Sequence, residues 1–206
     1  SSDLYDLPQG VPVFLFVGRM MWYKGVRLTL DALDALKSQG ISFRMVFIGG
    51  GADLEEIKAY CEELKLSDVC FFTGAIHDRE VLRVWYCRAD LFLFPSTYDT
   101  NGLVVREAAA CSLASILVEG SCAAEGVTGD RNGFLAKETA ASIAVKLSML
   151  SEHPEAMKQA GIAYATDQII DLIANGVNHI HIYTMNKPEI AAKIQENLSS
   201  IIPLPL

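Results

Sequence analysis

The chain has 206 residues, and its 25 aspartates and glutamates outnumber its 17 lysines and arginines to give a formal net charge of −8. This length fits one domain or two small ones, and the acidic balance without any basic run argues against nucleic acid or an anionic membrane surface as a partner. The apolar residues form short blocks, far below the roughly 18 consecutive residues that a membrane-spanning helix requires.

Apolar blocks alternate with amphipathic stretches as far as Val118, and this alternation predicts the architecture. The predicted strands are Pro12–Val17, Phe43–Ile48, Val69–Thr73, Asp90–Phe94 and Ser115–Val118. The predicted helices between them are Val26–Ser38, Leu54–Leu64, Asp78–Cys87 and Leu103–Ala110. Near-continuous apolar strands separated by helices predict a single parallel sheet covered on both faces. Right-handed crossovers make it a doubly wound, Rossmann-like α/β fold.

The C-terminal part has a different pattern. Two long helices are predicted over Thr139–Leu150 and Pro154–Asn175, followed by a strand over Val177–Thr184 and a helix over Pro188–Leu198. The predicted strand carries His179, His181 and Tyr183 on one face, and we expect these to pack against a helix because no third metal ligand accompanies the histidines. The apolar tail Ile201–Leu206 is either a docked strap or a disordered end.

The start of the chain and the cysteines indicate the compartment. No basic segment precedes an apolar one at the start, so a signal peptide is not expected. The five cysteines are odd in number and contain no Cys-x-x-Cys pair. We expect a cytoplasmic protein with buried, reduced thiols. The cysteines are Cys61, Cys70, Cys87, Cys111 and Cys122.

The first candidate site lies in the loop after the first strand. Gly18 and Arg19 open this loop and Lys24 precedes the next helix, so two cations lie near a helix N-terminus that is itself positive. This arrangement suits a diphosphate. The loop matches neither the Walker A nor the G-x-G-x-x-G pattern, so neither an ATPase nor a simple dinucleotide site is indicated.

The second candidate site follows the fourth strand. Asp99 and Glu107 lie eight positions apart across a loop-to-helix junction. The residues Gly102, Leu103 and Val104 begin the helix with free N–H groups. The Glu107 carboxylate is placed to hold a sugar diol. The alternative interpretation is a solvated loop acid or helix cap for Asp99 and an exposed helix residue for Glu107.

These two segments, together with the strand end Val46–Gly51, resemble the C-terminal, donor-binding domain of family 4 retaining glycosyltransferases of the GT-B fold. The segment Gly129–Leu135 resembles the loop and strand that follow there, so the likeness covers about residues 8–150. It implies a nucleotide-sugar site that needs no metal or other cofactor, with UDP or a UDP-sugar as the possible ligand. Retaining transfer of this kind works mainly by positioning and by stabilising the departing diphosphate.

The resemblance also implies a role for each residue. Arg19 and Lys24 match the pair that contacts the diphosphate, and Glu107 matches the acid that binds the ribose. Asp99 stands where the family usually has Glu, and Asn101 where it usually has Phe, so the hexose contact differs. The full set of implied donor-binding residues is Gly18, Arg19, Lys24, Gly49, Asp99, Asn101, Gly102, Leu103, Val104 and Glu107.

A second resemblance covers about residues 155–200, which look like the end of methylenetetrahydrofolate reductase, a flavin-dependent (β/α)8 barrel. It depends mostly on the run His181–Asn186. One strand and two helices cannot form a flavin or folate pocket. We therefore predict an engineered chimera forming one composite domain over residues 1–206. Residues 1–153 are the donor-domain part, and a barrel-derived helix-strand-helix unit over 154–206 completes the sheet.

The predicted function is a retained nucleotide-sugar diphosphate site without catalytic turnover, because the acceptor domain of these enzymes is missing. Two alternatives stay open. The chain is a natural fragment of a retaining glycosyltransferase that transfers a hexose with a separate acceptor domain, or it is an inert scaffold with a vestigial site.

Overall fold

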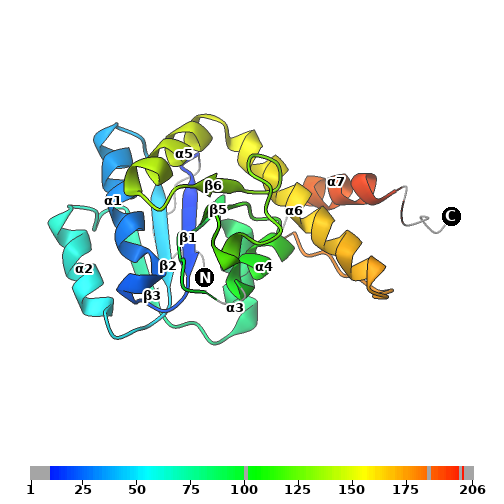
Figure 1. Cartoon of the computed structure of the whole chain (residues 1–206), viewed down its shortest axis with the longest axis horizontal. Coiled ribbons are helices and arrows are strands. Elements are labelled where there is room, and N and C mark those ends of the chain that lie inside the picture. The colour runs from blue at the N-terminus through cyan, green and yellow to red at the C-terminus, as the bar shows by residue number, and fades with distance from the viewer. Residues whose placement is uncertain (1–9, 100–101, 185–186, 200, 202–206) are drawn as a thin grey trace.

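The computed structural model describes residues 10–99, 102–184, 187–199 and 201 (Figure 1). Its centre is one sheet of six parallel strands in the order β3-β2-β1-β4-β5-β6. The strands are β1 (Val13–Val17), β2 (Arg44–Ile48), β3 (Cys70–Gly74), β4 (Leu91–Phe94), β5 (Ser115–Val118) and β6 (Phe134–Ala136). This order reverses direction beside β1, as in a doubly wound sheet, and it confirms the predicted fold class.

Helices cover both faces of the sheet (Figure 1). They are α1 (Val26–Ser38), α2 (Leu54–Glu63), α3 (Arg79–Arg88), α4 (Leu103–Ala110), α5 (Ala140–Glu152), α6 (Pro154–Ala174) and α7 (Pro188–Leu198). α1 packs against α5 in one layer, whereas α4 packs against α3 and α6 in the other. The predicted bounds of the elements up to β5 lie within two residues of these.

Burial on both faces of the sheet explains why the strand sequences are continuous apolar runs. Phe16 on β1 lies beside Phe47 on β2 and Phe94 on β4, with ring centroids 5.9 and 5.6 Å apart. All three side chains are fully buried. A strand covered by helices on both faces has no solvent side, so polar residues do not alternate along it.

The strand predicted over Val177–Thr184 is wrong, and the segment therefore adds nothing to the sheet edge. It is irregular, and its histidines and Tyr183 are exposed. Ile180 and Ile182 instead pack against a small apolar cluster between α6 and α7. The Arg83 guanidinium on α3 lies over the Tyr183 ring, 3.9 Å from the ring centroid. The alternation of apolar and polar residues indicates only that one side of the segment is half-buried. A half-buried side does not require pairing with a neighbouring strand.

α7 packs mainly against α6, and the buried residues of both helices form this small cluster. It contains the buried residues Ile162, Ala165, Ile169, Ile190, Ile194 and Leu198. The first half of α6, by contrast, contributes Met157, Ala160 and Tyr164 to the main core. α6 therefore joins α7 to the rest of the molecule, and the two helices form the protruding hairpin at one end of the view in Figure 1.

The cysteine prediction is confirmed in part. All five cysteines are free, and Cys61, Cys70 and Cys87 are buried. Cys111 is half-buried, and Cys122 is exposed on the short 3-10 turn Cys122–Ala124 after β5, which contradicts the expected burial. Among the described helices, none is both long and apolar enough to cross a membrane.

The separate cluster predicts that α7 opens independently of the sheet. Ile194 is fully buried, so Ile194→Ala should weaken the packing of α7 by about 2–5 kcal/mol. We expect faster hydrogen exchange at the amides of α7 while those of β1 stay protected. Lys193→Ala, on the exposed face of the same helix, is the control and should change neither. Equal loss of protection in β1 after Ile194→Ala would contradict this account.

Candidate functional site

Three loops at the carboxyl edge of the sheet contact one another through their backbones. Gly49 after β2 has a φ of +143°, and a Cβ atom there would lie 1.8 Å from the carbonyl oxygen of Gly18 after β1. Gly25, before α1, has a φ of +76°, and a Cβ atom there would lie 2.2 Å from the carbonyl oxygen of Pro95 after β4. Only glycine allows both contacts. The loop after β1 is therefore held between its two neighbours.

This arrangement brings Lys24 to Asp99, 75 positions away along the chain. Lys24 Nζ donates to Asp99 Oδ1 at 2.7 Å, and the two side chains are 9% and 21% exposed. Asp99 Oδ2 is buried and has no hydrogen-bond partner among the described residues. A buried carboxylate oxygen without a donor is unfavourable. The pair thus combines a neutralised cation with a carboxylate whose second oxygen lacks a donor.

One aromatic ring lies near both cations. Tyr23 lies 5.8 Å from the Arg19 guanidinium and 5.3 Å from Lys24 Nζ, measured to its ring centroid. Tyr98 meets Tyr23 edge to face, with centroids 6.2 Å apart. The sequence pattern does not single out either tyrosine, although each stands directly beside a predicted site residue.

The N-terminus of α4 lies where the sequence predicted it. Gly102 is the cap residue in the left-handed region, with a φ of 51°, and it has no side chain that could accept from the first N–H groups of the helix. Its carbonyl oxygen accepts from Val105 and Arg106. Leu103 is exposed, whereas Val104 is half-buried. Asn101 lies outside the described residues.

Glu107 on α4 has a partner that the sequence did not reveal. The Tyr86 hydroxyl on α3 donates to Glu107 Oε2 at 3.0 Å. Burial, followed by the nearby Glu107 charge, raises the pKa of Tyr86 well above its usual range, so the phenol stays a donor. The exposed Glu107 carboxylate is therefore oriented by one hydrogen bond, and its other oxygen is left for a ligand.

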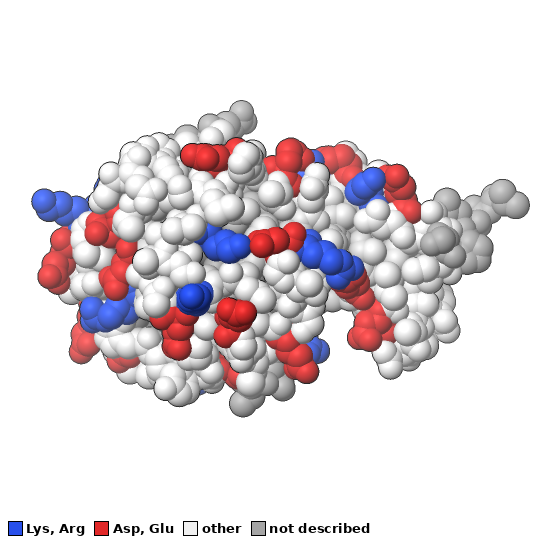
Figure 2. All heavy atoms as spheres, turned by 45° about the horizontal axis from the view of Figure 1, so that its top comes forward, with Lys and Arg blue, Asp and Glu red and all other residues white. Residues whose placement is uncertain are grey.

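Lysines and arginines mix with aspartates and glutamates over the face in Figure 2, so this face carries no broad basic field. The described residues contain no group of three His, Cys, Asp or Glu side chains that could hold a metal ion. Two cations, a helix N-terminus and an oriented carboxylate can bind a small anion that carries hydroxyl groups.

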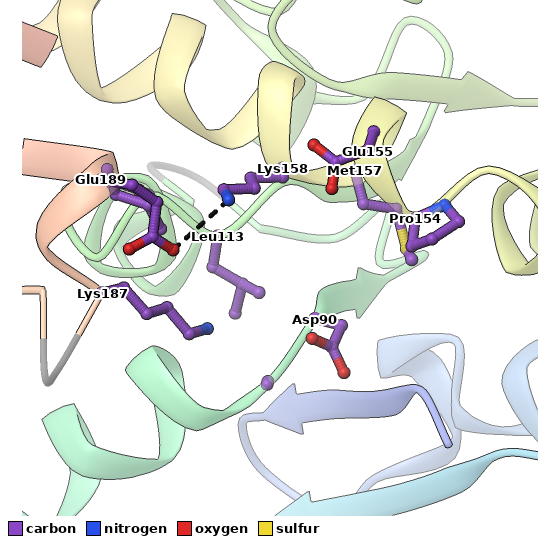
Figure 3. Close-up of a pocket in the computed structure, with 11 residues that line it drawn as sticks. Asp90, Leu113, Pro154, Glu155, Met157, Lys158, Lys187 and Glu189 are labelled. Atoms are coloured by element: carbon purple, nitrogen blue, oxygen red, sulfur yellow. Dashed lines mark ion pairs between the residues drawn. The ribbon is translucent and has the colours of Figure 1, made fainter. Parts of the chain in front are cut away.

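Two cavities differ in what they offer. One of about 210 Å³ lies at the opposite edge, before β4 and β5, where Lys158 pairs with Glu189 at 3.3 Å (Figure 3). Lys187 in this cavity donates to the Cys87 carbonyl oxygen, so both lysines have partners. The other cavity, of about 460 Å³, lies beside the loop of Asp99 and is lined by Thr97 and Ser121. The second has room for a sugar next to the candidate site.

The comparison with protein families identifies the family of the chain. The family described as "Glycosyl transferases group 1" matches residues 4–163. The chain therefore belongs to the group 1 glycosyl transferases. A second family, methylenetetrahydrofolate reductase, matches residues 134–199, which overlaps the first match and runs to the end of α7.

Known relatives agree with this family. A GDP-mannose-dependent alpha-(1-6)-phosphatidylinositol dimannoside mannosyltransferase of Mycobacterium tuberculosis is 30% identical over 67% of the chain, which spans only 35% of that relative. Among solved structures, the C-terminal domain of a group 1 glycosyl transferase from Francisella tularensis has a TM-score of 0.68 at 23% identity, covering 81% of this chain and 87% of that one. Anabaena HepE, solved with UDP and glucose, has a TM-score of 0.68 at 21% identity, covering 93% and 49%.

The ion pair of the site yields a stability prediction. Lys24→Met leaves a largely buried carboxylate unpaired and should lower the free energy of unfolding by about 1–3 kcal/mol in urea denaturation. Adding Asp99→Asn should recover part of this loss. The control is Lys37→Met, which breaks the more exposed Lys37–Asp68 pair and should cost at most about 1 kcal/mol. If the two variants lost equal free energy of unfolding, burial would not explain the contribution of the Lys24–Asp99 pair.

Proposed function

We propose that the chain binds a nucleoside-diphosphate sugar at the carboxyl edge of its sheet, between the loop after β1 and the N-terminus of α4. The observation that carries this proposal is the meeting of Lys24 and Asp99 beside Arg19. Cations and free backbone N–H groups at a helix start are the groups that bind diphosphates. HepE was solved with UDP and glucose, which supports the same ligand class here.

Each part of the ligand has a partner in this proposal. Arg19 and Lys24 contact the two phosphates, and the N–H groups of Gly102, Leu103 and Val104 cradle them. Gly49 allows the loop after β2 to approach the carbonyl oxygen of Gly18, in the loop that bears Arg19 and Lys24. Asn101, which lies outside the described residues, belongs to the proposed donor-binding set through the family resemblance.

The sugar and the ribose take the two carboxylates. Asp99 Oδ1 stays with Lys24, while its buried Oδ2 accepts from a sugar hydroxyl and gains the donor that it lacks. The cavity lined by Thr97 and Ser121 accommodates the ring. Glu107, held by Tyr86 through one oxygen, accepts from the ribose diol.

We further propose that this domain binds its donor without transferring the sugar. Tyr98 is 74% exposed and Leu103 65%, so the mouth of the site is open to water. Transfer requires an acceptor held against the donor in a closed site. The alternative is a natural fragment that transfers a hexose with a separate acceptor domain. Sugar-nucleotide turnover by the chain alone would rule out the inactive assignment.

The two family matches, which overlap over residues 134–163, also support a composite origin, which we propose as an engineered join near residues 153 and 154, where α6 begins. The glycosyl transferase match ends at residue 163 and the reductase match continues to residue 199. The main-core contacts of α6 come from its first half, and its second half packs against α7. The alternative is natural divergence of a glycosyltransferase tail.

Calorimetric titration with UDP, GDP and their hexose derivatives tests the binding proposal. We expect binding of at least one nucleotide. Arg19→Met and Glu107→Gln should each weaken it about 10- to 100-fold, since each removes a charge-assisted contact.

The matched control for these variants is Arg27→Met. Arg27 also lies over aromatic rings, 4.5 Å from Trp22 and 4.3 Å from Tyr60, but on the side of α2. Its loss should leave nucleotide affinity unchanged. No heat at millimolar nucleotide, with the fold intact by circular dichroism, would leave only the inert scaffold with a vestigial site.

A further inference from the structure

The proposed function does not by itself explain what holds the Arg19 side chain in position. Its side chain is exposed, and among the described residues no carboxylate lies within ion-pair distance of it. A free arginine on a surface samples many rotamers, and fixing it on a ligand loses that entropy.

Tyr23 is the residue that contacts both cations. Its ring centroid lies 5.8 Å from the Arg19 guanidinium and 5.3 Å from Lys24 Nζ, within the range of cation–π attraction. One ring thus lies within cation–π range of both cations. Asp99, by contrast, stabilises Lys24 by taking up its charge.

Two contacts favour one orientation of the Tyr23 ring. Tyr23 belongs to the 3-10 turn Trp22–Lys24, which the glycine contact at Gly25 holds against the loop after β4. Tyr98 of that loop meets it edge to face at 6.2 Å. Such pairs favour a defined angle between rings. The two tyrosines come from the same two loops that bring Lys24 to Asp99.

We propose that Tyr23 is a positioning residue for the anion site, holding the Arg19 guanidinium in place on the loop that also bears Lys24 before a diphosphate arrives. This inference rests on the proposed function, because it assumes that the anion is the diphosphate of a nucleotide. The phenol hydroxyl has no part in it, so phenylalanine can replace tyrosine here.

The test is a set of UDP and GDP titrations of the intact chain and its variants. Tyr23→Leu should weaken binding of the nucleotide about two- to fivefold, the value of an exposed cation–π contact. Tyr23→Phe should restore wild-type affinity. In an Arg19→Met background, Tyr23→Leu should cost less than twofold, because the group that it positions is gone.

Tyr60→Leu is the matched control. It removes an aromatic ring 4.3 Å from Arg27, outside the site, and should leave nucleotide affinity unchanged. Tyr23 is 38% exposed, so the thermal midpoint of Tyr23→Leu should stay near that of the wild type, which separates positioning from folding.

Three results would overturn the inference. If the wild type binds neither nucleotide, the proposed function fails and the inference with it. If the wild type binds and Tyr23→Leu binds equally well, only the inference fails. If Tyr23→Phe weakens binding as much as Tyr23→Leu, the hydroxyl contacts the ligand directly and positioning is wrong.

Discussion

The site depends on backbone contact between loops at the carboxyl edge of the sheet. The loop after β1 touches its neighbours at Gly49 and at Gly25, where a side chain would lie within 2.2 Å of a carbonyl oxygen. Parallel strands bring their following loops to one edge, but they do not fix how closely the loops approach. Glycine at these two points sets that distance, and Lys24 reaches Asp99 because of it.

The pairing of Lys24 with Asp99 changes how the charges of the site act. A cation already bound to a carboxylate attracts an anion less than a free one does. Arg19, which has no such partner among the described residues, then carries most of the unneutralised charge. The acid in turn presents a buried oxygen that needs a donor. Such a site favours a ligand with both phosphates and hydroxyl groups over a simple anion.

The sequence predicted the sheet well because strands buried on both faces are continuously apolar, as β1 and β4 are. It also predicted the start of α4, since Gly102 directly precedes a run of helix-forming residues. It could not reveal the contacts of Lys24 with Asp99 or of Tyr86 with Glu107, because pairing across 75 or 21 positions leaves no local pattern. It failed at Val177–Thr184, where alternation reflects packing on helices.

Nuclear magnetic resonance of the amide groups during titration with UDP or GDP tests the location of the site most directly. We expect the largest shifts at Arg19, Lys24 and the first residues of α4. The amides around the cavity at the opposite edge, such as those of Ser112 and Glu155, should stay unchanged. Shifts confined to that opposite cavity, or no shifts at saturating nucleotide, would contradict a diphosphate site at the carboxyl edge of the sheet.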